Sequence, residues 1–208
     1  MTDSKPAKLV ELARLIAEWP GLVGRPDLDL VLDSLVLLDH LGTAKSVVDV
    51  GSGAGLPGLP LKIERPALSV TLVEADQRKA AFLVQACAVL GLKDVDVVAM
   101  RAEEAGHDPR YREAFDVAVA RALAPTPVLA ELCLPLVRVG GRLLAQKTES
   151  DDLTSARHAI DVLGGALLEV IPAPSAGRRK GTVVVVEKVR PTPPEYPRRP
   201  GVPSRRPL

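Results

Sequence analysis

The chain of 208 residues is poor in aromatic side chains, with one tryptophan, two tyrosines and two phenylalanines. These are Trp19, Phe82, Tyr111, Phe115 and Tyr196. Proteins that bind single-stranded RNA by stacking several bases on a sheet need more aromatic side chains than this. The composition therefore argues against that mode of RNA recognition.

An excess of charge of one sign is also missing. The chain contains 27 Lys and Arg residues and 26 Asp and Glu residues, so the formal net charge is +1. Proteins that coat nucleic acid through bulk charge carry a larger excess of basic residues. Any contact with nucleic acid must therefore use local basic patches, and no DNA partner is expected.

Cysteines and long apolar runs are scarce as well. Cys87 and Cys133 are the two cysteines, and they are not spaced as a metal-binding or redox pair. We expect both to be buried thiols in a reducing compartment, with no metal site. No apolar run reaches the roughly 18 residues of a membrane span, and residues 1–20 lack the apolar core of a signal peptide. These features favour a cytoplasmic protein without a membrane partner.

What the chain does have is a regular alternation of short β-branched runs with helical stretches. Strands are predicted at 46–50, 69–74, 95–99, 115–120, 142–146, 167–171 and 182–187. Helices are predicted at 5–18, 28–41, 76–90, 127–138 and 151–163. Alternating strands and helices indicate a doubly wound α/β fold, whose mostly parallel sheet is covered on both faces. The connection from about 171 to 182 is too short and polar for a crossover helix, so we expect the seven-stranded sheet to end in an antiparallel hairpin.

Three regions follow from this pattern: an N-terminal helical cap (1–42), a Rossmann-like domain (43–190) and a tail (191–208). The tail holds seven prolines, four arginines and one acid. Proline blocks helices and sheets, so we expect an extended segment that adds no further layer. Two readings stay open for it: a disordered terminus, and a basic arm that contacts phosphates.

The strongest local signal is a glycine-rich turn at residues 51–58, directly after a buried strand. Such a turn lets the backbone approach a ligand at the carboxyl edge of the sheet. Gly53, Gly55 and Gly58 match the letters of a dinucleotide-binding loop, which alone is weak evidence. A purely structural glycine turn is a further alternative.

Charges around the turn favour S-adenosyl-L-methionine as the ligand. Asp49, which we expect to face the pocket, would repel a pyrophosphate and attract the cationic methionine part. The turn starts at Gly51, one residue after the strand, as in class I methyltransferases. Glu74 ends the second strand, where its carboxylate can accept both ribose hydroxyls.

Two later loops complete the expected site. Arg101, Ala102, Glu103 and Glu104 follow the third strand, where Ala102 and Glu103 can meet the adenine ring, although a charged helix start is the plain alternative. Arg121 follows the fourth strand, where the substrate enters.

Two catalytic devices are missing after the fourth strand: an Asn/Asp-Pro-Pro-aromatic loop for methylating base amines, and a nucleophilic cysteine for methylating base carbons. An acceptor that is already a nucleophile, such as guanine N7, needs neither, because catalysis then reduces to alignment and electrostatics. The histidines at 40, 107 and 158 are expected at the surface and not as bases.

Several segments together resemble the bacterial small-subunit ribosomal RNA guanine-N7 methyltransferases, the RsmG or GidB family. The matching blocks are 32–34, the loop 49–58 with its Leu56-Pro57-Gly58 ending, 101–103, 121–122, 140–147 and the tail from Thr192 to Pro207. Departures occur after Trp19, at Asp29-Leu30 and at Thr148.

The resemblance implies a class I S-adenosylmethionine-dependent methyltransferase that modifies N7 of a guanine in small-subunit (16S) ribosomal RNA, naked or in the assembled subunit. It places cofactor contacts at Gly51, Leu56, Ala102, Glu103 and Arg121. It places substrate-side cations at Arg101, Lys147 and Arg121, and at Arg179 or Lys180, where the register is ambiguous. Two alternatives stay open: the same fold acting on another substrate, and a non-catalytic RNA-binding or assembly factor.

Overall fold

The computed structural model describes residues 4–208 except 25, 149–152, 154 and 177. A seven-stranded sheet forms its centre, with strand order β3-β2-β1-β4-β5-β7-β6. The strands are β1 (Ser46–Val50), β2 (Ser69–Val73), β3 (Val95–Val98), β4 (Phe115–Arg121), β5 (Val137–Thr148), β6 (Gly165–Pro172) and β7 (Gly181–Lys188). Strands β1 to β5 pair in parallel, whereas β7 is antiparallel to both β5 and β6. The predicted fold class, including the terminal hairpin, is confirmed.

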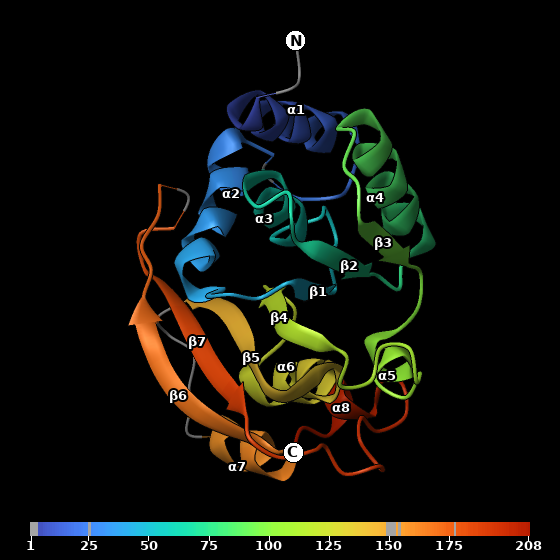
Figure 1. The fold of residues 1–208 in the computed structure, drawn as a ribbon, viewed down its shortest axis with the longest axis vertical. Coiled ribbons are helices and arrows are strands. Elements are labelled where there is room, and N and C mark those ends of the chain that lie inside the picture. The colour runs from blue at the N-terminus through green and yellow to red at the C-terminus, as the bar shows by residue number, and fades with distance from the viewer. Residues whose placement is uncertain (1–3, 25, 149–152, 154, 177) are drawn as a thin grey trace.

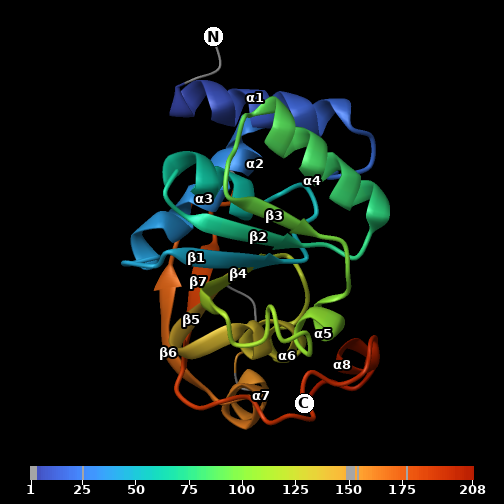
Figure 2. The same cartoon turned by 45° about the vertical axis from the view of Figure 1, so that its right-hand side comes forward.

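Helices cover both faces of this sheet (Figures 1 and 2). On one face lie α1 (Lys5–Glu18), α2 (Leu28–Leu32), the 3-10 helix η1 (Asp33–His40), α3 (Gly58–Glu64) and α4 (Gln77–Val89). On the other lie α5 (Ala102–Ala105), α6 (Thr126–Cys133), the 3-10 turn η2 (Leu134–Leu136), α7 (Ala156–Val162) and α8 (Val202–Arg205). Each face has its own buried apolar cluster, so the sheet separates two cores.

The expected helix at 28–41 is an α-helical turn followed by a longer 3-10 helix. Val31, Ser34 and Leu37 are buried at a spacing of three, which a 3-10 helix places on one face. Asp27 caps the start, because its carboxylate accepts the N–H of Leu30 at 2.8 Å. Gly42, with φ +55°, ends the segment in the left-handed conformation.

Other differences from the sequence prediction lie at the ends of elements. The helix expected at 127–138 ends at Cys133 because Pro135 cannot continue it, and β5 begins at Val137. Helix α7 falls inside the range expected at 151–163, of which residues 151, 152 and 154 lie outside the described part. Helices α3 and α8 were not predicted, because each is too short to show a clear apolar period. Helix α5 matches the helix start given as the alternative for residues 101–104.

The tail differs more strongly. Residues 191–208 have little regular secondary structure before α8, but they pack against the face that carries α5 and α6 (Figure 2). Pro197 is buried, and the buried Thr192 donates its hydroxyl to the carbonyl of Leu163 at 3.0 Å. Contacts with buried polar groups of the domain hold the segment in place. The expectation of an extended segment that adds no further layer did not include these contacts. The division of the chain at residues 42 and 190 stays a prediction.

Both cysteines are free; Cys133 is buried and Cys87 is half-buried. Burial raises the pKa of the Cys87 thiol to about 11, so this thiol is not a nucleophile at neutral pH. Within the described ranges, no helix has the length and apolarity that a membrane crossing requires. The same part of the chain has no cluster of three or more His, Cys, Asp or Glu side chains suited to a metal ion.

Candidate active site

Two cavities lie side by side at the carboxyl ends of the parallel strands. The first, called here the glycine-loop cavity, measures about 330 Å³. It is lined by Gly51, Gly53, Val73, Glu74, Ala75, Lys79, Met100, Arg101, Ala102, Glu103, Ala122, Leu123 and Leu132. The second, called here the arginine cavity, measures about 670 Å³. It is lined by Val23, Gly24, Leu30, Asp33, Arg121, Ala122, Ala124, Pro125, Gln146, Lys147 and Arg178.

Ala122 belongs to the walls of both cavities and marks their junction. It has φ +50°, a left-handed conformation that a residue with a Cβ rarely adopts. Such strain at the end of a strand persists where the surroundings impose it, and it is common at active sites. The geometry thus places two ligand-sized spaces on either side of one short, strained turn.

The glycine loop forms one wall of the first cavity. A Cβ built on Gly53 would meet only the carbonyl oxygen of Gly51, at 3.8 Å, so the space beside Gly53 is open. At Gly51 a Cβ would lie 2.4 Å from Cδ1 of Leu123, so that glycine allows the loop to pack against the turn after β4. Both glycines have positive φ, at +70° and +55°. The loop can therefore cradle a ligand at its backbone.

Glu74 is held rigidly at the floor of the same cavity. Its two carboxylate oxygens accept the N–H groups of Gly53 and Asp76, each at 2.8 Å. Each oxygen keeps a second lone pair, because a carboxylate can accept about four hydrogen bonds. A fixed carboxylate with spare acceptors can bind further hydroxyl donors, and the ribose contact expected of Glu74 from its place after β2 stays a prediction.

Ala102 and Glu103 line this cavity, as expected, but the Glu103 carboxylate is already engaged. Its oxygens accept the guanidinium of Arg101 at 3.2 and 3.3 Å and the N–H of Gly201 at 2.8 Å. Burial raises the pKa of Glu103, but these hydrogen bonds outweigh it and hold the pKa below its usual value. A base in the cavity would therefore meet the backbone of residues 102–103 and apolar side chains, and the Glu103 carboxylate orients this wall.

Asp49 is not where the sequence analysis places it. Its side chain is fully buried and does not line either cavity, since the loop 51–58 folds back over it. Oδ2 accepts the N–H of Gly58 at the start of α3, at 2.8 Å, and Oδ1 has no hydrogen-bond partner. Burial raises the pKa of Asp49 to about 7. The carboxylate supports the glycine loop through Gly58, and its contact with the cofactor stays a prediction.

Leu56 is likewise a core residue, 4% exposed and absent from both cavity walls. It packs in the apolar cluster beneath the loop because the turn after Gly55 directs it inward. The cofactor contact that the resemblance places at Leu56 therefore stays a prediction.

The arginine cavity is lined by three cationic side chains and one acid, which lies close to two of them. Arg121 Nη1 lies 3.5 Å from Oδ2 of Asp33, and Arg178 Nε lies 3.6 Å from Oδ1. Lys147 donates from Nζ to the carbonyl of Ala124 at 2.6 Å. Burial lowers the pKa of Arg121 and of Arg178, while Asp33 acts in the opposite direction on both. Cations in excess in a partly buried cavity favour an anionic ligand.

Neutral groups hold this cluster together. Gln146 is 1% exposed, and its amide Nε2 donates to the carbonyl of Asp33 at 2.8 Å. The hydroxyl of Ser175 donates to Oδ1 of Asp33. Asp33 is therefore fixed by strand β5 and by the β6–β7 connection, although it lies in the N-terminal part of the chain.

The structure separates the three predicted substrate-side cations. Arg121 and Lys147 share the arginine cavity, whereas Arg101 lies on the wall of the glycine-loop cavity with Glu103. Arg121 was expected to contact both cofactor and substrate, but it lines only the arginine cavity. Its neighbour Ala122 lies at the junction of the two cavities.

Sequence reasoning missed Asp33, Gln146 and Arg178 as cavity residues. Residues 32–34 belong to a family block, and the resemblance places a cation at Arg179 or Lys180 in a stretch of ambiguous register. In the structure the cavity takes Arg178, while Arg179 and Lys180 are exposed.

Known proteins match this chain over most of its length. The family model described as "rRNA small subunit methyltransferase G" matches residues 28–179. The ribosomal RNA small subunit methyltransferase G of Roseiflexus sp. (strain RS-1) is 50% identical over 196 residues, 93% of this chain and 82% of that protein. The protein of the same name from Moorella thermoacetica is 46% identical over 183 residues, 86% of this chain and 76% of that protein.

Solved structures agree on the fold. A SAM-dependent methyltransferase from Aquifex aeolicus is similar with a TM-score of 0.61 at 16% identity, covering 86% of this chain and 98% of that one. The T. thermophilus 16S rRNA N2 G1207 methyltransferase is similar with a TM-score of 0.53 at 18% identity, covering 78% of this chain and 40% of that one. The sheet order and these neighbours give the class I S-adenosylmethionine-dependent methyltransferase fold. The chain belongs to the rRNA small subunit methyltransferase G family, and it is an enzyme that methylates ribosomal RNA of the small subunit.

Proposed function

We propose that this enzyme transfers a methyl group from S-adenosyl-L-methionine to N7 of a guanine in small-subunit ribosomal RNA. The observation that carries the proposal is the pair of cavities that meet at Ala122. One is lined by the Glu74 carboxylate and the glycine loop, and the other by Arg121, Arg178, Lys147 and Asp33.

The glycine-loop cavity fits the methyl donor in size and chemistry. Its volume of about 330 Å³ lies within the range of about 300–1,000 Å³ that is common for small-molecule sites. Glu74 would hold the ribose, and Val73, Met100 and Leu132 supply apolar surface for the adenine. The open space at Gly53 admits the methionine part, close to the junction with the second cavity. When bound, S-adenosylmethionine supplies an electrophilic methyl group on a sulfonium.

The arginine cavity fits a nucleotide of RNA. Arg121, Arg178 and Lys147 offer donors to phosphate oxygens and to the O6 atom of guanine. Binding O6 presents the adjacent N7 toward Ala122 and the donor cavity. Asp33 limits the positive charge around a base that itself becomes cationic on methylation. The chain thus binds and aligns the acceptor, which is the main requirement of this reaction.

No general base is needed for an N7 acceptor, and the site agrees with that. The N7 lone pair lies in the plane of the ring and carries no proton. Among the lining residues of both cavities there is no histidine or cysteine. Asp33 is already engaged in ion pairs with Arg121 and Arg178.

The test is chemical mapping of the methylated nucleotide. Small subunits from cells that lack the gene are methylated in vitro with the purified enzyme, then treated with borohydride and aniline, which cleave RNA at N7-methylguanine. We expect one new cleavage site, at a guanine; naked RNA run in parallel shows whether the assembled subunit is required. Methyl incorporation without any aniline-sensitive site would refute N7 and leave the methyltransferase activity intact.

A further inference from the structure

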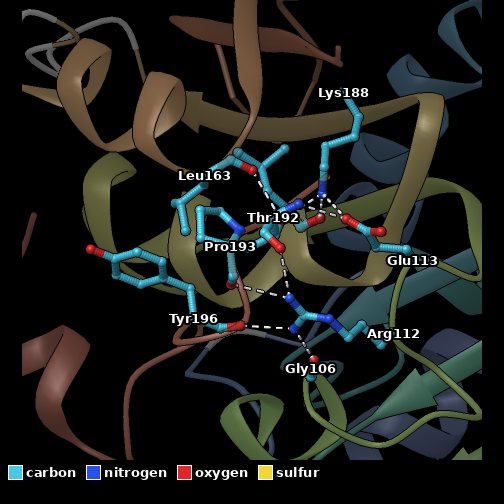
Figure 3. A network of polar contacts seen from close by, with 9 residues as sticks. Gly106, Arg112, Glu113, Leu163, Lys188, Thr192, Pro193 and Tyr196 are labelled. Carbon is cyan, nitrogen blue, oxygen red and sulfur yellow. Dashed lines mark hydrogen bonds and ion pairs between the residues drawn. The ribbon is translucent and has the colours of Figure 1, made fainter. Parts of the chain in front are cut away.

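The segment after β7, residues 189–208, is fastened to the domain by two cations, the buried Lys188 and the half-buried Arg112 (Figure 3). Lys188 is fully buried and donates from Nζ to the carbonyl of Leu134 and to the hydroxyl of Thr192, both at 2.6 Å. It also lies 3.1 Å from the carboxylate of Glu113. Burial lowers the pKa of Lys188 to about 8, while Glu113 acts in the opposite direction. These contacts hold the start of the segment against η2.

Arg112 fastens the segment further along. Its guanidinium donates to the carbonyls of Thr192, Pro193 and Tyr196, at 2.8 to 3.2 Å (Figure 3). It also donates to the carbonyl of Gly106, the residue that follows α5, at 2.7 Å. One side chain thus ties the C-terminal segment to the end of α5.

Beyond these anchors the segment reaches the wall of the glycine-loop cavity. Glu131 in α6 is fully buried and accepts hydrogen bonds from three donor atoms of Arg198: the backbone N at 2.8 Å, Nε at 2.9 and 3.2 Å, and Nη2 at 2.6 Å. The next residue of α6, Leu132, lines the cavity. Gly201 then donates its N–H to the cavity residue Glu103 at 2.8 Å.

These contacts matter because α5 is only four residues long. A single helical turn is not stable by itself, so its position depends on partners outside it. In the described part of the chain those partners include Gly106–Arg112, His107 with the carbonyl of Pro197, and Glu103 with Gly201. Two of the three lead to the C-terminal segment directly, and the third leads there through Arg112.

We infer that the C-terminal segment is a working part of the methyl-donor site, in which Arg198 and Gly201 are positioning residues that hold α6 and α5 as its outer wall. This inference rests on the proposed placement of S-adenosylmethionine in the glycine-loop cavity. It differs from both readings of the tail taken from the sequence, since neither a disordered terminus nor an arm for RNA phosphates involves the cofactor. By linkage, a docked segment raises cofactor affinity, and bound cofactor holds the segment docked by the same factor.

The test compares two adjacent arginines. Arg198→Ala removes the contacts with Glu131, while Arg199→Ala removes an identical charge from an exposed side chain. Isothermal titration with S-adenosylmethionine should show a Kd at least about tenfold higher for Arg198→Ala and unchanged for Arg199→Ala. Arg198→Lys keeps the charge without the planar fork, so it should fall between them. Hydrogen exchange should show that S-adenosylmethionine slows the amides of residues 196–206 in the wild type.

Each other outcome overturns the inference. A folded Arg198→Ala with unchanged cofactor affinity would show that the segment is purely structural. If Arg198→Ala does not fold, truncation after Pro200 replaces it, because this variant keeps the Arg198–Glu131 contact and removes the Gly201 amide. Unchanged affinity of the truncated protein for S-adenosylmethionine then contradicts the inference. Unchanged hydrogen exchange at residues 196–206 of the wild type contradicts it as well. Gly53→Val distinguishes a failure of this inference from a failure of the proposed cofactor placement. If it binds S-adenosylmethionine normally, the placement of the cofactor itself is wrong.

Discussion

Asp33 lies between Arg121 and Arg178, at 3.5 Å from one guanidinium and 3.6 Å from the other. The three residues come from η1, β4 and the β6–β7 connection, so one carboxylate joins three distant parts of the chain. It also keeps two cations close together in a cavity where burial lowers the pKa of both. The pairing makes a cationic cavity compatible with a folded core.

Asp33→Asn should therefore destabilise the protein strongly. The amide keeps the size of the side chain but leaves two partly buried guanidinium groups without a counter-charge. Removing one partner of a buried ion pair costs about 3–5 kcal/mol. Urea unfolding measures the effect, with the exposed Asp39→Asn in the same helix as control. Equal midpoints for both variants would show that the Asp33 pairs contribute nothing.

Lys147→Ala should separate substrate from cofactor. Its ammonium lines the arginine cavity and not the glycine-loop cavity. S-adenosylmethionine affinity should stay within a few-fold, whereas methyl transfer falls strongly. If the lysine meets a phosphate, the log–log salt slope of RNA binding should also drop by about 0.7–0.9. Arg179→Ala, which removes an exposed cation nearby, is the matched control. Parallel loss of cofactor binding would place Lys147 on the donor side.

Gly53→Val should abolish S-adenosylmethionine binding. The branched side chain would fill the space beside the loop and oppose a φ of +55°. Gly42 has the same φ, +55°, with nothing within 4 Å of an added Cβ. Gly42→Val thus pays a similar backbone strain of about 1–2 kcal/mol away from the cavity. Titration calorimetry should show binding by Gly42→Val and none by Gly53→Val. Binding by both would remove the loop from the cofactor site.

Asp49 should make the stability of the fold depend on pH. Its pKa is about 7 in the folded state, against 3.8 for the ordinary side chain. The folded state therefore keeps a proton that the unfolded chain has lost, so this contribution is complete below about pH 4 and disappears as the pH rises through 7. A pKa difference of about three units corresponds to at most about 4 kcal/mol in the free energy of unfolding.

Asp49→Asn, which cannot ionise, should lack that decline. Denaturant unfolding of the wild type and the variant between pH 4 and 8 measures the difference. The wild-type curve should fall relative to Asp49→Asn over this range, with Asp39→Asn following the wild type. Parallel curves for wild type and Asp49→Asn would mean that Asp49 ionises normally in the fold.

The amino-acid sequence by itself determined the order of the elements and the place of the glycine loop. Runs such as 46–50 and 182–187 are apolar or β-branched enough to be strands in any context, and their alternation with helices leaves one fold class. The loop 51–58 follows directly from its glycines, and Glu74 from its place at the end of β2. The family blocks 101–103 and 121–122 lie beside the cavities because residues after parallel strands meet at one edge.

Tertiary structure alone decided which side chains meet. Arg178 and not Arg179 lines the cavity, because the pairing of β5 with β7 sets the register of that connection. Asp33 joins it from the other end of the chain, and Gly201 reaches Glu103 across 98 residues. Asp49 is covered by the loop that follows it. Sequence periodicity reports contacts within an element, whereas these contacts depend on how distant segments pack, and so they appear only in the folded chain.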